Sequence, residues 1–197
     1  MTHPPIIIVT GPSGAGKSTV VDAILANVGA RFPRPGGVTP PLRKFVTCTT
    51  RPRRPGEKNG RDYHFMTRKK FEQDIKDGWF FEHAEVYGNL YGSSRRVMEK
   101  LFKGKSPIIG VLDVQGAKTV KRVIPEAFII FIDAPKKSLV TRLKDRKTDA
   151  EELKRRIAKM EMEKKLKKSF DIAIMNPDGK IKETLKKVEA AIKRIVK

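Results

Sequence analysis

The residues best suited to chemistry lie in segment 11–18, which reads Gly-Pro-Ser-Gly-Ala-Gly-Lys-Ser. This order matches the pattern G-x-x-x-x-G-K-[ST], in which glycines let successive backbone N–H groups turn inward around a phosphate group. In such a loop Lys17 reaches the β- and γ-phosphates of a nucleoside triphosphate, and the Ser18 hydroxyl binds Mg²⁺. An apolar run precedes the segment and a helical pattern follows it, which favours a phosphate loop over a chance glycine-rich turn. The predicted triphosphate-binding residues are Gly11, Pro12, Ser13, Gly14, Ala15, Gly16, Lys17, Ser18 and Thr19.

A second candidate site is the cationic segment 47–65, which contains Arg51, Arg53, Arg54, Lys58 and Arg61. Cations so close together repel one another, so the segment predicts an anionic partner. Guanidinium groups bind a phosphate through paired hydrogen bonds, whereas a lysine acts as a point charge. The segment follows an apolar run, and we expect it at the sheet edge where open α/β folds bind ligands.

Five short apolar runs supply the strands that must position these segments. They are unbroken rather than alternating, which is typical of strands buried on both faces of a parallel sheet. Helical patterns lie between them, as at 18–29 and in the C-terminal segment, where apolar residues recur at intervals of three and four. This alternation predicts a layered α/β fold. The runs are residues 5–10, 44–49, 107–114, 127–134 and 170–176.

Two segments do not fit the alternation of strands and helices. Residues 50–103 combine the cationic loop with short strand patterns and a helix around 67–77, which indicates a small, mostly β insertion. Residues 136–168 hold fourteen Lys and Arg against six Asp and Glu, so they predict a helical pair too charged to belong to the core.

Composition narrows the class of protein without naming a partner. The 197 residues are 39% apolar and 33% charged, which suits one folded core. The formal charge of +21 attracts nucleotides, nucleic acids and acidic lipids alike. Cys48 is the single cysteine, which excludes an internal disulfide, and no run approaches the ~20 apolar residues of a membrane span. We therefore expect a cytoplasmic protein with no membrane partner.

Three further stretches, spaced as they are behind the phosphate loop, resemble the sequences of guanylate kinases: "TTRPRRPGEKNGRDYHF", "FFEHAEVYGNLYGSS" and "LDVQG". The resemblance spans nearly the whole chain. It implies a three-layer P-loop NTPase fold with a five-stranded parallel sheet, a small, mostly β GMP-binding insertion and a helical lid. It also implies ATP:GMP phosphotransfer, with ATP and GMP as small-molecule partners and Mg²⁺ as the cofactor. We expect core segments at 1–46, 104–135 and 169–197, the insertion at 47–103 and the lid at 136–168.

The resemblance divides the cations of segment 47–65. It implies that Arg51 and Arg54 bind the GMP phosphate together with the hydroxyls of Tyr63 and Tyr91, and that Glu57 supports the arginine loop. The other three cations match no ligand position and are expected to be solvated turn residues. The acceptor oxygen of a nucleoside monophosphate is already an anion, so the reaction needs cations around the phosphorus rather than a general base.

The predicted guanine reader is Glu82. A carboxylate accepts hydrogen bonds from both N1–H and N2–H of guanine, whereas the N1 acceptor of adenine would be repelled. By resemblance, Thr47 and Ser93 add hydroxyl groups. Asp113, at a strand end opposite the phosphate loop, is expected to contact either the guanine amino group or the Mg²⁺ shell.

The sequence departs from the family pattern near the metal. Val111 stands where most guanylate kinases carry Asp or Glu. We therefore expect Ser18, Asp113 and the phosphates to hold Mg²⁺, and we expect a lower turnover. In the lid, Arg142, Arg146 and Arg156 match the arginines that close over ATP. The predicted catalytic residues are Lys17, Arg51, Arg142, Arg146 and Arg156.

Three other functions stay open from the sequence. A guanylate-kinase-like module can lose catalysis and bind a phosphorylated partner, but the phosphate loop of such modules is usually degraded, and here Lys17 and Ser18 are present. A kinase acting on a ribose bisphosphate would not require Glu82 with the two tyrosines. The chain has no aromatic–basic RNA motif, so we expect no specific nucleic acid partner.

Overall fold

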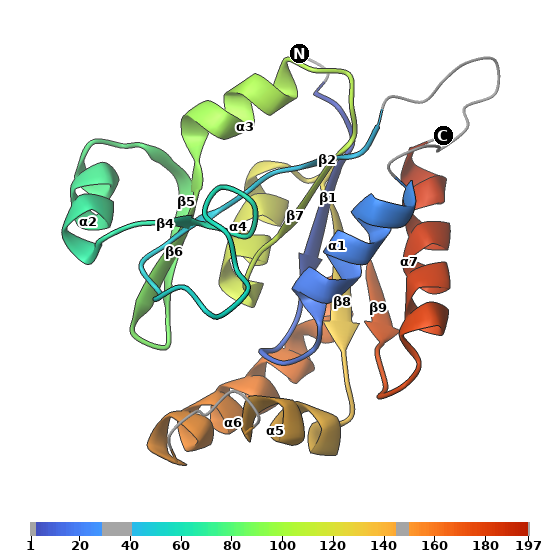
Figure 1. Ribbon diagram of the computed structural model, residues 1–197. Helices are drawn as coiled ribbons and strands as arrows, with labels where there is room; N and C mark the ends of the chain where they lie inside the picture. Colours follow the sequence, from blue (N-terminus) through green and yellow to red (C-terminus); the bar gives the residue numbers. More distant parts are fainter. Residues whose placement is uncertain (1–2, 29–40, 145–149, 197) are drawn as a thin grey trace.

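A parallel sheet of five strands forms the centre of the computed structural model, which describes residues 3–28, 41–144 and 150–196 (Figure 1). Its spatial order is β2–β7–β1–β8–β9, and every neighbouring pair is parallel. The predicted five-stranded parallel sheet is therefore confirmed. The strands are β1 Ile6–Thr10, β2 Arg43–Lys44, β7 Ile108–Val111, β8 Phe128–Asp133 and β9 Ile172–Met175.

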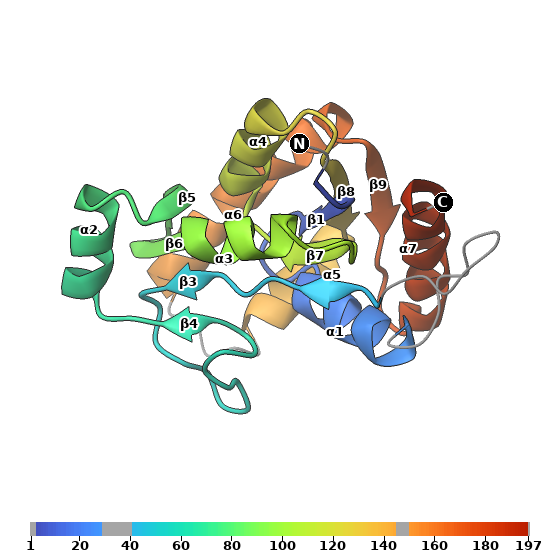
Figure 2. The same cartoon turned by 90° about the horizontal axis from the view of Figure 1, so that it is seen from above.

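Helices cover both faces of this sheet (Figures 1 and 2). Successive side chains of a strand point to opposite faces, so Ile7 and Val9 of β1 pack under α1 and α7, while Ile6 and Ile8 pack under α3 and α4. All four side chains are buried, and burying one such side chain contributes about 1.5–3 kcal/mol. This double burial explains the unbroken apolar run and confirms the three-layer fold. The helices are α1 Lys17–Val28, α3 Arg95–Phe102, α4 Val114–Val123 and α7 Ile181–Ile195.

A second sheet of four strands, in the order β4–β3–β6–β5, stands beside the first and forms the mostly β insertion. Its small core consists of Cys48, Phe71, Phe80 and Leu90, with the rings of Phe71 and Phe80 stacked 4.2 Å apart. Phe71 comes from α2, so this helix closes the sheet. Burial, with the nearby charge of Asp74, raises the pKa of the Cys48 thiol to about 11. The elements are β3 Cys48–Thr49, β4 His64–Phe65, α2 Arg68–Lys76, β5 Phe80–Val86 and β6 Asn89–Ser94.

The prediction of a single core strand at 44–49 is wrong. Only Arg43–Lys44 pairs with β7, and Cys48–Thr49 pairs with β4 and β6 of the second sheet. Between them the Phe45 ring lies over Gly110, where a Cβ atom would come within 1.8 Å of the ring. Phe45 is buried in the core of the parallel sheet and Cys48 in the core of the second sheet, so the two halves of the run share a buried pattern although they belong to different sheets.

The charged segment forms the predicted helical pair, α5 Lys136–Lys144 and α6 Ala150–Lys165, followed by a short 3₁₀ helix at Leu166–Ser169. The strand predicted at 107–114 is shorter, because Asp113 is the N-cap of α4 and accepts hydrogen bonds from the backbone N–H groups of Gln115 and Gly116. Among the helices of the described ranges, none is both long and apolar enough to cross a membrane.

Candidate active site

The phosphate loop connects β1 to α1 and has the backbone that its glycines require. Gly11, Gly14 and Gly16 have φ angles of +133°, +87° and +88°, a region that other residues adopt with strain. A Cβ atom at Gly11 would lie 2.1 Å from the carbonyl oxygen of Ile132, and one at Gly16 would lie 2.6 Å from Nδ2 of Asn176. The loop is therefore closely packed on its outer side and leaves its inner side for an anion.

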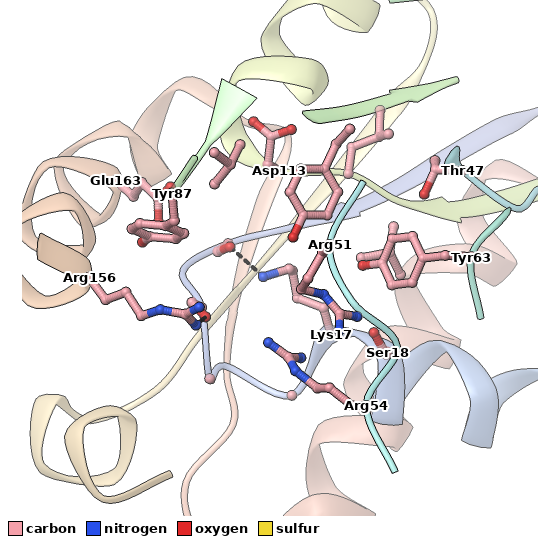
Figure 3. Close-up of a pocket in the computed structure, with 18 of the residues that line it drawn as sticks. Lys17, Ser18, Thr47, Arg51, Arg54, Tyr63, Tyr87, Asp113, Arg156 and Glu163 are labelled. Atoms are coloured by element: carbon pink, nitrogen blue, oxygen red, sulfur yellow. Dashed lines mark hydrogen bonds between the residues drawn. The ribbon is translucent and has the colours of Figure 1, made fainter. Parts of the chain in front are cut away.

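Lys17 lies over this loop (Figure 3). Its Nζ donates hydrogen bonds to the carbonyl oxygens of Gly11 at 2.7 Å and Pro12 at 2.9 Å. The ammonium group is thus held where a phosphate in the loop would meet it.

Arg51 and Glu57 form a two-point ion pair in the cationic segment. Nη2 of Arg51 donates to both carboxylate oxygens, at 2.7 and 2.9 Å, and the backbone N–H of Arg54 donates to the same carboxylate at 2.8 Å. Burial alone would lower the pKa of Arg51, but the hydrogen bond and charge of Glu57 raise it above its ordinary value. One carboxylate therefore fixes both the buried guanidinium group and the turn that carries Arg54.

Arg54 points into the pocket near Lys17 (Figure 3). Burial, and then the charges of Arg51 and Arg156, lower its pKa, while Glu57 and Tyr91 act in the opposite direction. The guanidinium groups thus repel one another across the pocket, and an anion between them would relieve that repulsion. The other three cations of the segment are exposed, as expected of turn residues.

Glu82 lies on β5 at the far end of the pocket and is 5% exposed. Its Oε1 accepts a hydrogen bond from the Ser93 hydroxyl at 2.6 Å. Burial raises the pKa of Glu82 to about 7, helped by the charge of Asp113 and opposed by the hydrogen bonds from Ser93. Gly116 approaches the same carboxylate so closely that a Cβ atom there would lie 2.8 Å from Oε2. The carboxylate is therefore held in one place and titrates near neutral pH.

Two tyrosines link the arginine end of the pocket to the carboxylate end. The rings of Tyr63 and Tyr91 meet edge to face with centroids 6.0 Å apart, and Cζ of Arg51 lies 5.4 Å from the centre of the Tyr63 ring. Burial, with the neighbouring Tyr91, raises the pKa of Tyr63 to about 12. The Tyr63 hydroxyl therefore stays protonated and able to donate at neutral pH.

The predicted lid arginines take different positions. Arg156, on α6, is buried, and its Nη1 donates to Oγ of Ser13 at 3.3 Å. Arg142, on α5, donates to the carbonyl oxygen of Gly14 at 3.0 Å and pairs with Asp178 at 2.6 Å. Arg146 lies outside the described residues.

One pocket of about 150 Å³ brings most of the predicted residues together, from both sheets (Figure 3). Two predicted residues support the pocket from outside: Ser93 bonds to Glu82, and Glu57 pairs with Arg51. Arg142 instead borders a separate hollow of about 490 Å³ on the other side of Gly14 and Gly16. The predicted residues that line the pocket are Gly11, Ser13, Gly14, Gly16, Lys17, Ser18, Thr19, Thr47, Arg51, Arg54, Tyr63, Glu82, Tyr91, Asp113 and Arg156.

Among the pocket residues that the sequence analysis missed, Glu163 and Tyr87 carry polar side chains. Glu163 is 6% exposed, and its Oε2 is buried without a hydrogen-bond partner. Burial raises its pKa, with the charge of Asp113 adding to the shift and that of Lys17 opposing it. Its position seven residues after Arg156 places both on one helix face, a signal hidden by the many charges of α6.

The fold and the pocket define a P-loop α/β protein in which the phosphate loop faces a second anion site lined by arginines. This is the arrangement of a phosphoryl-transfer enzyme. The guanylate kinase family model matches residues 3–195. This chain belongs to the guanylate kinase family.

Individual relatives agree with the family model over most of the chain. A guanylate kinase of Thiobacillus denitrificans is 43% identical over 88% of this chain and 78% of its own length. One of Rubrobacter xylanophilus is 43% identical over 88% of this chain and 86% of its own. The crystal structure of guanylate kinase from Anaplasma phagocytophilum matches with a TM-score of 0.73 at 27% identity, covering 98% of this chain and 87% of that one.

Proposed function

We propose that this protein transfers the γ-phosphoryl group of ATP to GMP, giving ADP and GDP, and that it also accepts dGMP. The observation that carries the proposal is the single pocket that joins the phosphate loop to two arginines and a buried carboxylate. Family membership supports the same reaction. A phosphate oxygen of GMP attacks the γ-phosphorus, and the bond to the oxygen shared with the β-phosphate breaks. The attacking oxygen is already an anion, so no side chain has to remove a proton.

On the donor side, the phosphate loop and Lys17 hold the triphosphate, and Arg156 neutralises charge that develops on the transferred group. Arg142 borders the hollow of about 490 Å³, together with Asn176 and Asp178. We assign the adenine ring of ATP to this hollow, because the hollow opens directly beside Gly14 and Gly16. Asp178 also holds the planar guanidinium group of Arg142 at its wall, where an aromatic ring can lie against it.

On the acceptor side, Arg51 and Arg54 bind the GMP phosphate with the hydroxyls of Tyr63 and Tyr91. Glu57 fixes Arg51 in advance, so little side-chain freedom is lost when the phosphate arrives.

The guanine ring binds at the other end of the acceptor site. Ionised Glu82 accepts hydrogen bonds from N1–H and N2–H, and Thr47, Ser93 and Asp113 complete the base site. A hydrogen bond to a charged group contributes about 1.5–3 kcal/mol, and AMP would leave the carboxylate unpaired as well.

The donor groups beside the phosphate loop fit Mg²⁺. The Ser18 hydroxyl and the Asp113 carboxylate line the pocket, and Glu163 adds a buried carboxylate oxygen without a hydrogen-bond partner. Within the described residues, His, Cys, Asp and Glu form no group of three that could hold a metal by itself. This suits Mg²⁺, which usually takes one or two carboxylates, substrate phosphates and water. Bound there, it would neutralise charge on the β- and γ-phosphates, and Val111 adds no oxygen to the site.

A coupled assay of ADP release with GMP, dGMP, AMP, CMP and UMP tests the proposal. We expect turnover with GMP and dGMP and little with the other three nucleotides. If the folded protein released no ADP in response to GMP, the enzyme interpretation would be wrong, and a module binding a phosphorylated partner would replace it.

A further inference from the structure

Tyr87 occupies a backbone position that does not suit an aromatic residue. Val86 pairs with Asn89, so Tyr87 and Gly88 alone form the turn between β5 and β6. Their φ angles are +51° and +70°, the signs of a type I′ turn, whose first position favours Asn or Gly. Tyr87 is the one residue other than glycine with a positive φ in the described ranges. Because Asn would suit the turn better, the tyrosine side chain must serve another purpose.

The ring of Tyr87 lies at one side of the pocket, beside Glu163 and Arg156 of the lid helix α6 (Figure 3). Cζ of Arg156 lies 4.9 Å from the ring centre and Nζ of Lys159 lies 5.0 Å from it. Both cations belong to α6 and are three residues apart, so they share one helix face. A tyrosine ring attracts such cations through its negative face. The tip of the insertion is thus attached to the lid.

Each partner of this contact is also connected to one of the two proposed nucleotide sites. Arg156 donates to Ser13 in the phosphate loop. Tyr87 ends the hairpin whose two strands carry Glu82 and Tyr91. A continuous set of contacts therefore runs from the acceptor side, through the Tyr87 ring, to the phosphate loop.

We propose that Tyr87 is a positioning residue that couples the two substrates. When GMP binds to the hairpin, it fixes the turn, and the Tyr87 ring then holds Arg156 over the phosphate loop. ATP consequently binds more tightly to the GMP complex than to the free protein, and by linkage GMP binds more tightly to the ATP complex. The ring also offsets part of the repulsion between Arg156 and Arg54. This inference rests on the proposed function for the identity of the two ligands.

The test compares Tyr87→Asn with Tyr87→Phe. Asn suits the type I′ turn, so the first variant should fold at least as stably as the unmodified protein while lacking the ring. Phe keeps the ring and removes only the hydroxyl. Calorimetry would measure the affinity for a non-hydrolysable ATP analogue with and without GMP. We expect GMP to strengthen analogue binding about tenfold in the unmodified protein and in Tyr87→Phe, and to have almost no effect in Tyr87→Asn.

Steady-state kinetics provide a second readout that a purely structural role would not produce. In Tyr87→Asn, KM for ATP measured at saturating GMP should rise about tenfold, whereas the affinity for GMP alone should not change. An unchanged tenfold effect of GMP in Tyr87→Asn would overturn the proposal while leaving the proposed reaction intact.

A third experiment separates the coupling from the reaction. The effects of Tyr87→Asn and Lys159→Met on urea unfolding should be non-additive if the ring and the lid interact, whether or not GMP is a substrate. Additive effects would refute the contact. Absence of GMP binding to the unmodified protein, with non-additive effects in urea, would refute the reaction and the substrate coupling but keep the attachment of hairpin to lid.

Discussion

Raising the pH from 6 to 8 should strengthen GMP binding, because the carboxyl group that we propose to bind the guanine ring, Glu82, is expected to titrate in this range. Burial raises the pKa of Glu82 to about 7. The ionised fraction is then about 9% at pH 6 and about 91% at pH 8, a tenfold difference. In the proposed complex GMP donates two hydrogen bonds to the ionised form, so its affinity should rise about tenfold, or about 1.4 kcal/mol, across this range.

The control is Glu82→Gln, because the phosphate of GMP also loses a proton near pH 6. Calorimetry would give Kd for GMP at each pH in both proteins, and the ratio of the two Kd values cancels the titration of the ligand. We expect this ratio to grow about tenfold from pH 6 to pH 8 in favour of the unmodified protein. A ratio that does not change with pH would refute the assignment of Glu82 as the guanine reader.

Two further measurements follow from the same carboxyl group. A protonated Glu82 presents one donor and one acceptor, which match N1 and the amino group of adenine, so selectivity for GMP over AMP should fall at pH 6.

The raised pKa of Glu82 also makes the free energy of unfolding depend on pH. Glu82 binds a proton more tightly in the folded than in the unfolded chain, so its contribution to the free energy of unfolding falls as pH rises from about 4.5 to about 7. The loss should be about 3 kcal/mol and should be absent from Glu82→Gln in urea unfolding.

Three substitutions test the supports of the site and the core. Gly116→Ala places a Cβ atom 2.8 Å from Oε2 of Glu82, so KM for GMP should rise about tenfold while KM for ATP is unchanged. An unaltered KM for GMP would show that the carboxylate moves freely. Glu57→Gln removes the charge that holds Arg51, which should weaken GMP binding by about 1.5–3 kcal/mol in a GMP titration; an equal loss for guanosine would contradict a role at the phosphate. Gly110→Ala forces a methyl group against an aromatic ring of the core, so the free energy of unfolding in urea should fall by about 1–3 kcal/mol without a change in KM for either nucleotide. An unchanged unfolding midpoint would refute that packing.

Local signals were enough to predict the phosphate loop and the layers around it. The order of residues in segment 11–18 requires a particular backbone, and β1 is apolar on both faces because helices cover both. The run at 44–49 was misassigned for a physical reason. Burial gives the same apolar pattern whichever sheet a residue pairs with, so the sequence does not reveal that the chain passes from one sheet to the other between Lys44 and Cys48.

The parts of the pocket that the sequence analysis missed depend on contacts between distant segments. Glu163 is one charged residue among many on α6, and only the packing of that helix against the phosphate loop distinguishes it. Tyr87 precedes a glycine in an ordinary-looking turn, and neither its positive φ nor its contact with Arg156 can be read from neighbouring residues. The roles of the individual site residues toward ATP and GMP stay predictions.

The buried thiol of Cys48 makes the insertion measurable on its own. It is the single cysteine of the sequence and lies in the small core beneath α2, away from the core of the parallel sheet. With a pKa of about 11, it holds roughly a hundredfold less thiolate at neutral pH than an ordinary cysteine. A thiol reagent would therefore label the protein only when the four-stranded sheet opens. The labelling rate would report local opening of the insertion separately from global unfolding, with no engineered probe.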